Sequence, residues 1–122
     1  MTLLNLRPKT IFCDIDGTLV KHKGSASTQM KQKSEILPGV IEKMTEWDQK
    51  GYTVILVTGR RESFREETVK QLTNLGIHFD HLIMSIGSGQ RVLINDLKSN
   101  SKEPTAIAVN IERNKGLEDI EV

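Results

Sequence analysis

The sequence is poor in cysteine, in aromatic residues and in charge of one sign, and it holds no long apolar run. Its single cysteine, Cys13, can form neither an internal disulfide nor a cysteine-rich zinc site. Seventeen basic and sixteen acidic residues give a net charge of +1, so no strong overall field attracts nucleic acid or a membrane. No apolar run approaches the ~18 residues of a spanning helix, and the first residues lack the apolar stretch of a secretory signal. We therefore expect a cytoplasmic protein without membrane contact.

The chain of 122 residues has the length of one domain, and its 37% hydrophobic and 27% charged residues are ordinary for a globular protein. Short apolar runs alternate with segments of helical periodicity, which indicates an α/β fold with a mainly parallel sheet. We expect a single domain over 1–122 with a polar loop or flap over about 18–37. The acidic tail, 116–122, is expected to fray.

Strands and helices are predicted from the apolar runs and from the residues that bound them. The expected strands cover 10–14, 52–57, 82–84, 92–94 and 105–109. One helix is expected to open at Pro38 and to end in a left-handed cap at Gly51. A second helix is expected to begin with a capping box of Ser63 and Glu66 and to stop at Gly76.

Polar residues cluster directly after three of the expected strands. They are Asp14 and Asp16 after the first, Thr58 and Arg60 after the second, and Asn95 and Asp96 after the fourth. In open parallel sheets the ligand crevice lies outside the carboxyl ends of the strands. Three distant segments are therefore expected to converge on one site.

Two carboxylates, Asp14 and Asp16, stand two residues apart where a strand gives way to the turn at Gly17. They offer either two side chains on one face or one side chain and one backbone carbonyl. Both arrangements suit Mg²⁺, which takes oxygen ligands and keeps several waters, and Asp96 could supply a third oxygen. The alternative for Asp16 and Gly17 is ordinary turn chemistry.

Three segments, Asp14-Ile-Asp-Gly-Thr18, Val57-Thr-Gly-Arg60 and Leu93-Ile-Asn-Asp96, resemble the first, second and fourth motifs of the haloacid dehalogenase-like (HAD) phosphohydrolase superfamily. Leu37-Pro-Gly-Val40 also resembles the family, and the resemblance spans roughly residues 10–110. It implies a three-layer Rossmann-like domain with a mainly parallel sheet. The short gap between the first motif and Pro38 resembles members without a large cap domain.

The resemblance implies that the protein is a phosphatase that forms an aspartyl-phosphate. Asp14 would be the nucleophile, and Asp16 would protonate the leaving alcohol and then activate water. Mg²⁺ would sit between Asp14, the Asp16 carbonyl and Asp96, with Asn95 orienting a ligand where many relatives carry another acid.

Phosphate binding is expected from the second motif and from one basic side chain. The Thr58 hydroxyl and the backbone at Gly59 would hold phosphoryl oxygens. The family usually supplies a lysine, and sometimes an arginine, ahead of the fourth motif, but no lysine lies between Lys70 and Lys98. Arg91 is our first choice for the missing cation and Lys98 the second, and the alternative for each is a solvated surface charge.

Three further residues, Arg60, Lys21 and Asn110, are substrate-side candidates. Arg60 follows Thr58 and Gly59 directly, while Lys21 lies in the expected flap and Asn110 follows the last expected strand. A solvated flap is the alternative for Lys21.

The leading hypothesis is a Mg²⁺-dependent phosphomonoesterase for a small soluble substrate such as a sugar phosphate of polysaccharide biosynthesis. The second enzyme hypothesis is a polynucleotide 3′-phosphatase, in which the flap lysines would follow a nucleic-acid backbone and binding would weaken with salt. Only 4% of the residues are aromatic, which counts against base stacking. A third hypothesis is a non-catalytic phosphate-binding or regulatory domain. An open, nearly capless site leaves room for a neighbouring subunit, so a homo-oligomer is a further expectation.

Overall fold

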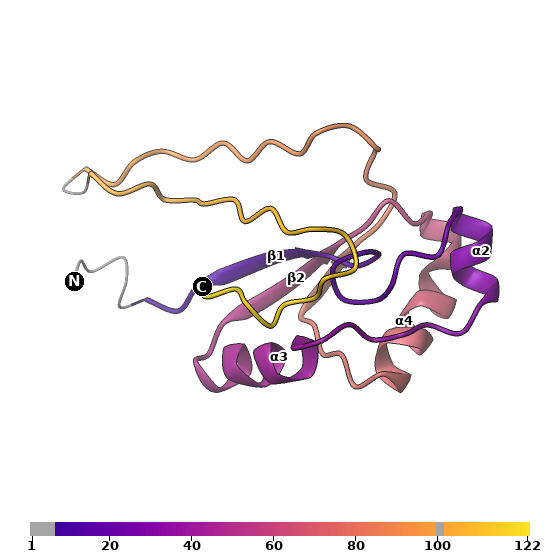
Figure 1. The fold of residues 1–122 in the computed structure, drawn as a ribbon. Helices are drawn as coiled ribbons and strands as arrows, with labels where there is room; N and C mark the ends of the chain where they lie inside the picture. The colour runs from indigo at the N-terminus through magenta and orange to yellow at the C-terminus, as the bar shows by residue number, and fades with distance from the viewer. Residues whose placement is uncertain (1–6, 100–101) are drawn as a thin grey trace.

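A parallel sheet of three strands carries the fold in the computed structural model, which describes residues 7–99 and 102–122. The strands are β1 (Thr10–Asp14), β2 (Thr53–Val57) and β3 (His81–Ile83), in the order β1-β2-β3 (Figure 1). Helix α3 (Val40–Gln49) connects β1 to β2, and a 3-10 turn (Glu62–Phe64) with α4 (Arg65–Asn74) connects β2 to β3. The α/β Rossmann-like class is confirmed, and the described residues form no large cap. Nor does this part of the chain contain a helix long and apolar enough to cross a membrane.

The core lies between the sheet and the apolar face of α3. Val40, Met44 and Trp47 recur at helical spacing and are all buried. In β2, buried Val54 and Leu56 alternate with half-buried neighbours, as expected for a strand that is covered by other elements. Gly51 has a φ of +74°, which confirms the predicted left-handed end of this helix.

The chain between β1 and α3 is more ordered than a simple flap. Isolated bridges join Asp16 to Val20 and Val20 to Ile36, so the base of this segment is a small folded unit. Leu19 and Val20 are buried there. The segment also contains a short helix, α2 (Ala26–Lys31), whose N-cap is Ser25.

The predicted strands at 92–94 and 105–109 are wrong. After β3 the chain leaves the sheet and runs out and back as two extended segments, 86–99 and 102–112, which lie beside each other (Figure 1). We call these two segments the arm. Val92 is 75% exposed and Ile94 88%, so these apolar side chains, which would favour a buried strand, are not buried against the described part of the chain. A strand is stabilised by its ladder and its packing, and β propensity alone does not provide either.

The expectation that the acidic tail frays is also wrong. The backbone N–H of Leu117 donates to the carbonyl of Pro38 at 2.9 Å, and the Leu117 side chain is 2% exposed. Ile120 and Val122 pack against the core. The charged residues of the tail thus alternate with apolar residues that anchor it.

The predicted capping box of α4 is not formed. Ser63 lies inside the 3-10 turn, and the N-cap position belongs to Phe64, which makes no side-chain cap. The helix begins at Arg65 because this turn precedes it, which places Ser63 too early to cap. Its predicted end is confirmed, since Gly76 has a φ of +78°.

Candidate active site

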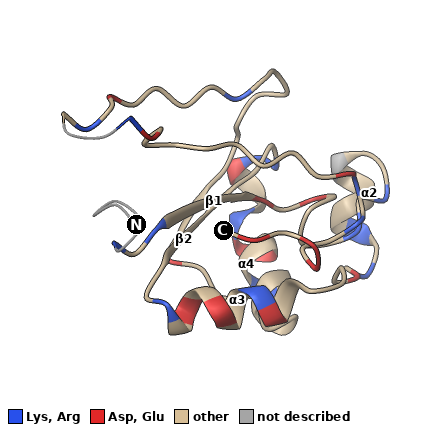
Figure 2. Cartoon of the chain, turned by 60° about the vertical axis from the view of Figure 1, so that its left-hand side comes forward, with Lys and Arg blue, Asp and Glu red and all other residues tan. Residues whose placement is uncertain are grey.

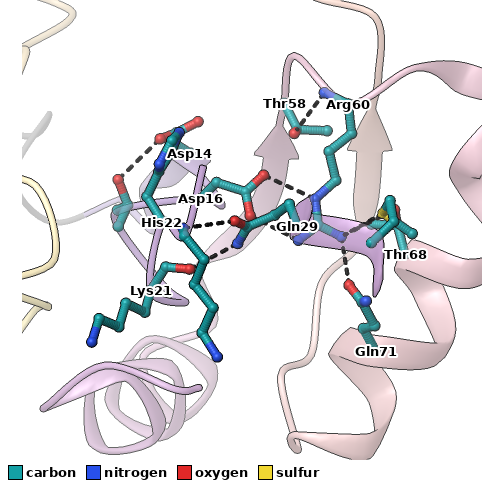
Figure 3. A network of polar contacts seen from close by, with 12 residues as sticks. Asp14, Asp16, Lys21, His22, Gln29, Thr58, Arg60, Thr68 and Gln71 are labelled. Carbon is teal, nitrogen blue, oxygen red and sulfur yellow. Dashed lines mark hydrogen bonds and ion pairs between the residues drawn. The ribbon is translucent and has the colours of Figure 1, made fainter. Parts of the chain in front are cut away.

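A buried ion pair between Asp16 and Arg60 forms the centre of the site (Figure 3). Arg60 Nε donates to Asp16 Oδ2 at 2.9 Å, and Nη2 donates to Oδ1 at 2.7 Å. The Arg60 side chain is 3% exposed and that of Asp16 is 18% exposed. Bidentate pairing of this kind fixes both the position and the plane of a carboxylate. Arg60 therefore holds Asp16 instead of facing a substrate, which corrects the expectation that it is a substrate-side residue.

The third guanidinium nitrogen of Arg60 is held by helix α4. Nη1 donates to Gln71 Oε1 at 2.7 Å and to Thr68 Oγ1 at 3.2 Å, and Met30 of α2 contacts the same nitrogen. A buried charge is tolerated when its hydrogen bonds are satisfied, and here each nitrogen has an acceptor. The sequence analysis missed Thr68 and Gln71. The available signal was two polar residues at helical spacing on the inner face, where Thr68 has no exposed surface.

Asp14 is the last residue of β1, and its carboxylate is reachable from solvent. Its side chain is 35% exposed; Oδ2 accepts the Thr18 hydroxyl at 3.1 Å, and Oδ1 faces Arg91 Nη1 at 3.3 Å. Of the two cations predicted to replace the missing lysine, the structure thus brings Arg91 to the carboxylate. Lys98 lies exposed on the arm.

Thr58 follows β2 and is fixed by backbone and side-chain hydrogen bonds. Its hydroxyl accepts the Arg60 N–H at 3.1 Å, and the residue is 1% exposed. Its N–H donates to the Ile83 carbonyl and its own carbonyl accepts the Ile86 N–H. A Cβ added at Gly59 would stand 3.3 Å from the carbonyl of Ile86, so a side chain at this position would be tightly confined.

The structure does not bring Asp96 to the other two carboxylates. The described residues contain no group of three or more His, Cys, Asp or Glu side chains that could hold a metal ion. Asp96 and Asn95 lie exposed on the arm, where the Asp96 carbonyl accepts the Thr105 hydroxyl. The predicted convergence failed because it depended on a strand at 92–94 that does not form. The oxygen donors that remain are the carboxylate of Asp14 and the carbonyl of Asp16, with waters and substrate oxygens to complete the shell that Mg²⁺ commonly takes.

Cys13 lies next to the candidate nucleophile, Asp14, but its thiol is unreactive. Burial, together with the charge of Asp14, raises the pKa of its thiol from 9.0 to about 12. A neutral thiol is neither a nucleophile nor a metal ligand. This confirms the interpretation of Cys13 as a small buried residue.

Basic residues lie around α2 (Figure 2), and Gln29 holds the backbone of two of them. The Gln29 side chain accepts the Lys23 N–H at 2.9 Å and donates to the Lys21 carbonyl at 2.7 Å. The Nζ of Lys23 lies 3.2 Å from Glu35, and this contact is the main reason that the pKa of the Glu35 carboxyl is lowered. Lys21 keeps about half of its side chain exposed. Asn110, the other substrate-side candidate, is exposed on the arm.

Comparisons with known proteins agree with this geometry. The family described as the polynucleotide kinase PNKP phosphatase domain matches residues 8–92. Among solved structures, chains from a Pnkp1/Rnl/Hen1 complex and from the Pnkp1/Rnl/Hen1 RNA repair complex are 34% and 33% identical, with TM-scores of 0.55 and 0.54. The alignments cover 70% and 69% of this chain but only 30% and 28% of those chains. A protein from Vibrio cholerae shares the fold at 19% identity and a TM-score of 0.54, over 72% of this chain and 79% of its own. No curated protein matches.

The α/β fold, with Asp14 at the end of β1, Asp16 just beyond it and Thr58 after β2, together with the family match, identifies a HAD-type phosphatase, a hydrolase of phosphate monoesters. Within that class, the chain belongs to the family of polynucleotide kinase PNKP phosphatase domains. The matched segment includes Asp14, Asp16, Arg60 and Arg91 and ends before Asp96. The chain spans about 30% of the length of the chains that it matches in these complexes.

Proposed function

We propose that the chain is a Mg²⁺-dependent phosphatase that removes the terminal 3′-phosphate of a polynucleotide. The observation that carries this proposal is the family match over 8–92, which contains the paired aspartates and Arg91. The 34% identity to a chain of the Pnkp1/Rnl/Hen1 complex supports the same substrate class. We therefore place this reaction ahead of the sugar-phosphate hypothesis that we favoured from the sequence.

The reaction has two steps at phosphorus. An oxygen of the Asp14 carboxylate bonds to phosphorus while the bond from phosphorus to the ester oxygen breaks, and Asp16, which enters this step as the protonated acid, gives its proton to the leaving oxygen. Water then attacks the aspartyl-phosphate, Asp16 takes its proton, and free phosphate leaves with Asp14 restored. Arg60 keeps the Asp16 carboxylate in one orientation through both steps.

Three groups stabilise the charge of the transferring phosphoryl group. The Thr58 hydroxyl is positioned by its bond to the Arg60 N–H and can still donate its own proton. Arg91 lies 3.3 Å from Asp14 and can move to a phosphoryl oxygen as the phosphate approaches. The Asp14 carboxylate and the Asp16 carbonyl would hold Mg²⁺, which neutralises charge on the phosphoryl oxygens when it is bound.

The test is phosphate release from a panel of 3′-phosphorylated oligonucleotides, 5′-phosphorylated oligonucleotides and sugar phosphates, with Mg²⁺ and with a chelator. We expect release from the 3′-phosphorylated oligonucleotide that needs Mg²⁺ and is abolished in Asp14→Asn. The matched control is Asp48→Asn, an exposed aspartate of α3, which should turn over at the wild-type rate. Thermal unfolding of both variants checks that the fold is kept.

Other outcomes would favour the competing hypotheses. Faster release from a sugar phosphate would return that substrate to first place, and turnover by Asp14→Asn would remove Asp14 from the nucleophile role. Phosphate binding without turnover of any member would indicate a non-catalytic domain. The homo-oligomer remains a prediction, and the mass of the protein in solution tests it.

A further inference from the structure

The segment that follows the arm is attached to the loop that carries the two aspartates. Asn114 adopts a left-handed conformation with φ of 66°, and its N–H donates to the Gly17 carbonyl at 2.8 Å. Its side-chain Oδ1 accepts the His22 N–H at 2.7 Å, and Nδ2 donates to the His22 carbonyl at 3.4 Å. A single residue, 92 positions along the chain from His22, thereby joins both ends of the turn after Asp16.

This attachment places two side chains against one point of that turn. A Cβ built on Gly17 would stand 3.1 Å from Arg113 Cγ and 3.6 Å from His22 Cβ. Gly17 has a φ of +88°, so the turn needs glycine both for its conformation and for the approach of Arg113. Arg113 and His22 are therefore neighbours across the residue that directly follows Asp16.

Arg113 is an exposed cation without a partner in the part of the chain that the structure describes. No ion pair or side-chain hydrogen bond holds its guanidinium there, whereas Lys115, two residues on, pairs with Asp119 at 3.5 Å. The overall charge of the protein is only +1, so an anionic substrate has to be attracted by local cations and not by the protein as a whole. A guanidinium matches two phosphate oxygens at once.

We propose that Arg113 and His22 form a subsite for the phosphodiester next to the leaving group, and that Asn114 is the residue that positions them. The inference rests on the proposed polynucleotide substrate, in which a second phosphate group lies one nucleotide from the phosphate removed. Arg113 and His22 lie against Gly17, which directly follows Asp16, so the subsite adjoins the residue proposed to protonate the leaving oxygen. Both Arg113 and Asn114 lie outside the residues that the family matches, which makes the subsite a feature of this chain's own C-terminal segment.

The experiment compares a dinucleotide 3′-phosphate, which has the internal phosphodiester, with a nucleoside 3′-monophosphate, which lacks it. Arg113→Gln should lower kcat/KM for the dinucleotide about tenfold more than for the mononucleotide, mainly through KM. Lys115→Gln removes the same charge two residues away and should leave both substrates at wild-type values. An equal loss on the two substrates, or no loss on the dinucleotide, would overturn the subsite.

The role of Asn114 is tested by comparing two substitutions at this position, Asn114→Ala and Asn114→Asp. Asn114→Ala should raise KM for the dinucleotide with a smaller change in kcat, because it removes the two side-chain hydrogen bonds to His22 while the backbone bond to Gly17 stays. Asn114→Asp keeps the acceptor for the His22 N–H and should restore much of the affinity. A loss of stability with an unchanged ratio between the two substrates would show a structural role only.

The subsite and the proposed function can fail separately. If the wild-type protein cleaves neither nucleotide, the phosphatase proposal fails, and binding is measured instead with a fluorescently labelled dinucleotide 3′-phosphate. Weaker binding by Arg113→Gln than by Lys115→Gln would then support the subsite. Equal binding by the two variants would overturn it.

Discussion

Replacing Arg60 by methionine is the sharpest test of the site. Methionine fills the channel of the aliphatic stem but has no donor for Asp16 or for the acceptors of α4. The pair is almost enclosed, with the Arg60 side chain 3% exposed and that of Asp16 18% exposed. After the substitution the Asp16 carboxylate keeps its burial and loses its counter-charge.

The size of the effect follows from that burial. Removing one partner of a buried pair costs about 3–5 kcal/mol, because the other charge stays desolvated. An exposed pair contributes only about 0–1 kcal/mol. We therefore expect Arg60→Met to lower the free energy of unfolding by about 3 kcal/mol, a large part of the 5–15 kcal/mol that is usual for a domain. Arg60→Lys keeps the positive charge, but an ammonium group cannot hydrogen-bond to Asp16 and Gln71 together as the planar guanidinium does. We therefore expect this substitution to lower the free energy of unfolding by about 2 kcal/mol.

The assay is urea unfolding followed by the fluorescence of Trp47. This is the only tryptophan in the sequence, and at 1% exposure it reports directly on the core. Arg61→Met is the matched control, because Arg61 is the exposed neighbour of Arg60 and should change stability by less than 0.5 kcal/mol, as surface substitutions usually do. Under conditions where both proteins are folded, kcat of Arg60→Met should fall by about 10²-fold or more, since a disoriented Asp16 loses its acid–base role.

A loss of stability in Arg60→Met within about 1 kcal/mol of that in the Arg61→Met control would show that the buried pair contributes little to stability. A double-mutant cycle with Asp16→Asn separates the pair from the α4 contacts. If the losses from Arg60→Met and Asp16→Asn simply add, the energy lies with Thr68 and Gln71 and not with the ion pair.

Three further predictions concern other parts of the molecule. Arg91→Gln should lower kcat by about 10-fold or more while Lys98→Gln leaves it unchanged, and steady-state kinetics on the preferred substrate would contradict this if the two variants behaved alike. The thiol pKa of Cys13 is raised by burial from 9.0 to about 12. The unfolded chain therefore ionises first, the contribution of Cys13 to stability falls between about pH 9 and pH 12, and a thiol reagent should react at pH 8 only after urea unfolds the protein. Gly116→Ala should lower the free energy of unfolding by more than about 1 kcal/mol, since a Cβ there would collide with the Pro38 carbonyl oxygen and the φ of +90° disfavours alanine. Gly87→Ala, with open space around it, should change stability very little in the same urea assay.

The elements that depend on neighbouring residues in sequence were predicted well. The strand at Thr10–Asp14, helix α3 and the stop at Gly51 follow from apolar spacing and backbone conformation. Asp14 and Thr58 were placed at the carboxyl ends of adjacent strands because parallel strands share one edge of the sheet. Only local pattern and sheet geometry were needed for these predictions.

The failures share a different cause, which is dependence on distant partners. Residues 92–94 have the composition of a strand but form no hydrogen bonds with the sheet in this structure. Asp96, the expected third metal ligand, therefore does not lie beside the other two aspartates. Arg60 was predicted to be a substrate-side residue because it directly follows Thr58 and Gly59. Its partner Asp16 lies 44 positions away, and no local pattern joins them.

Contacts between residues far apart in the sequence also fix the C-terminal segment, which the sequence predicted to be frayed. Its acidic residues suggested fraying, but Leu117 and its backbone bond to Pro38 fix the C-terminal segment beside the start of α3. Asn114 then ties that segment to Gly17 and His22. The turn that follows Asp14 is therefore held both by the hydrogen bonds from Arg60 to Asp16 and by those that join Asn114 to Gly17 and His22. Asn114→Ala should remove the side-chain hydrogen bonds to His22 while Leu117 stays in the core, so we expect the Asp16 pair to remain intact and the segment from Gly17 to His22 to gain mobility.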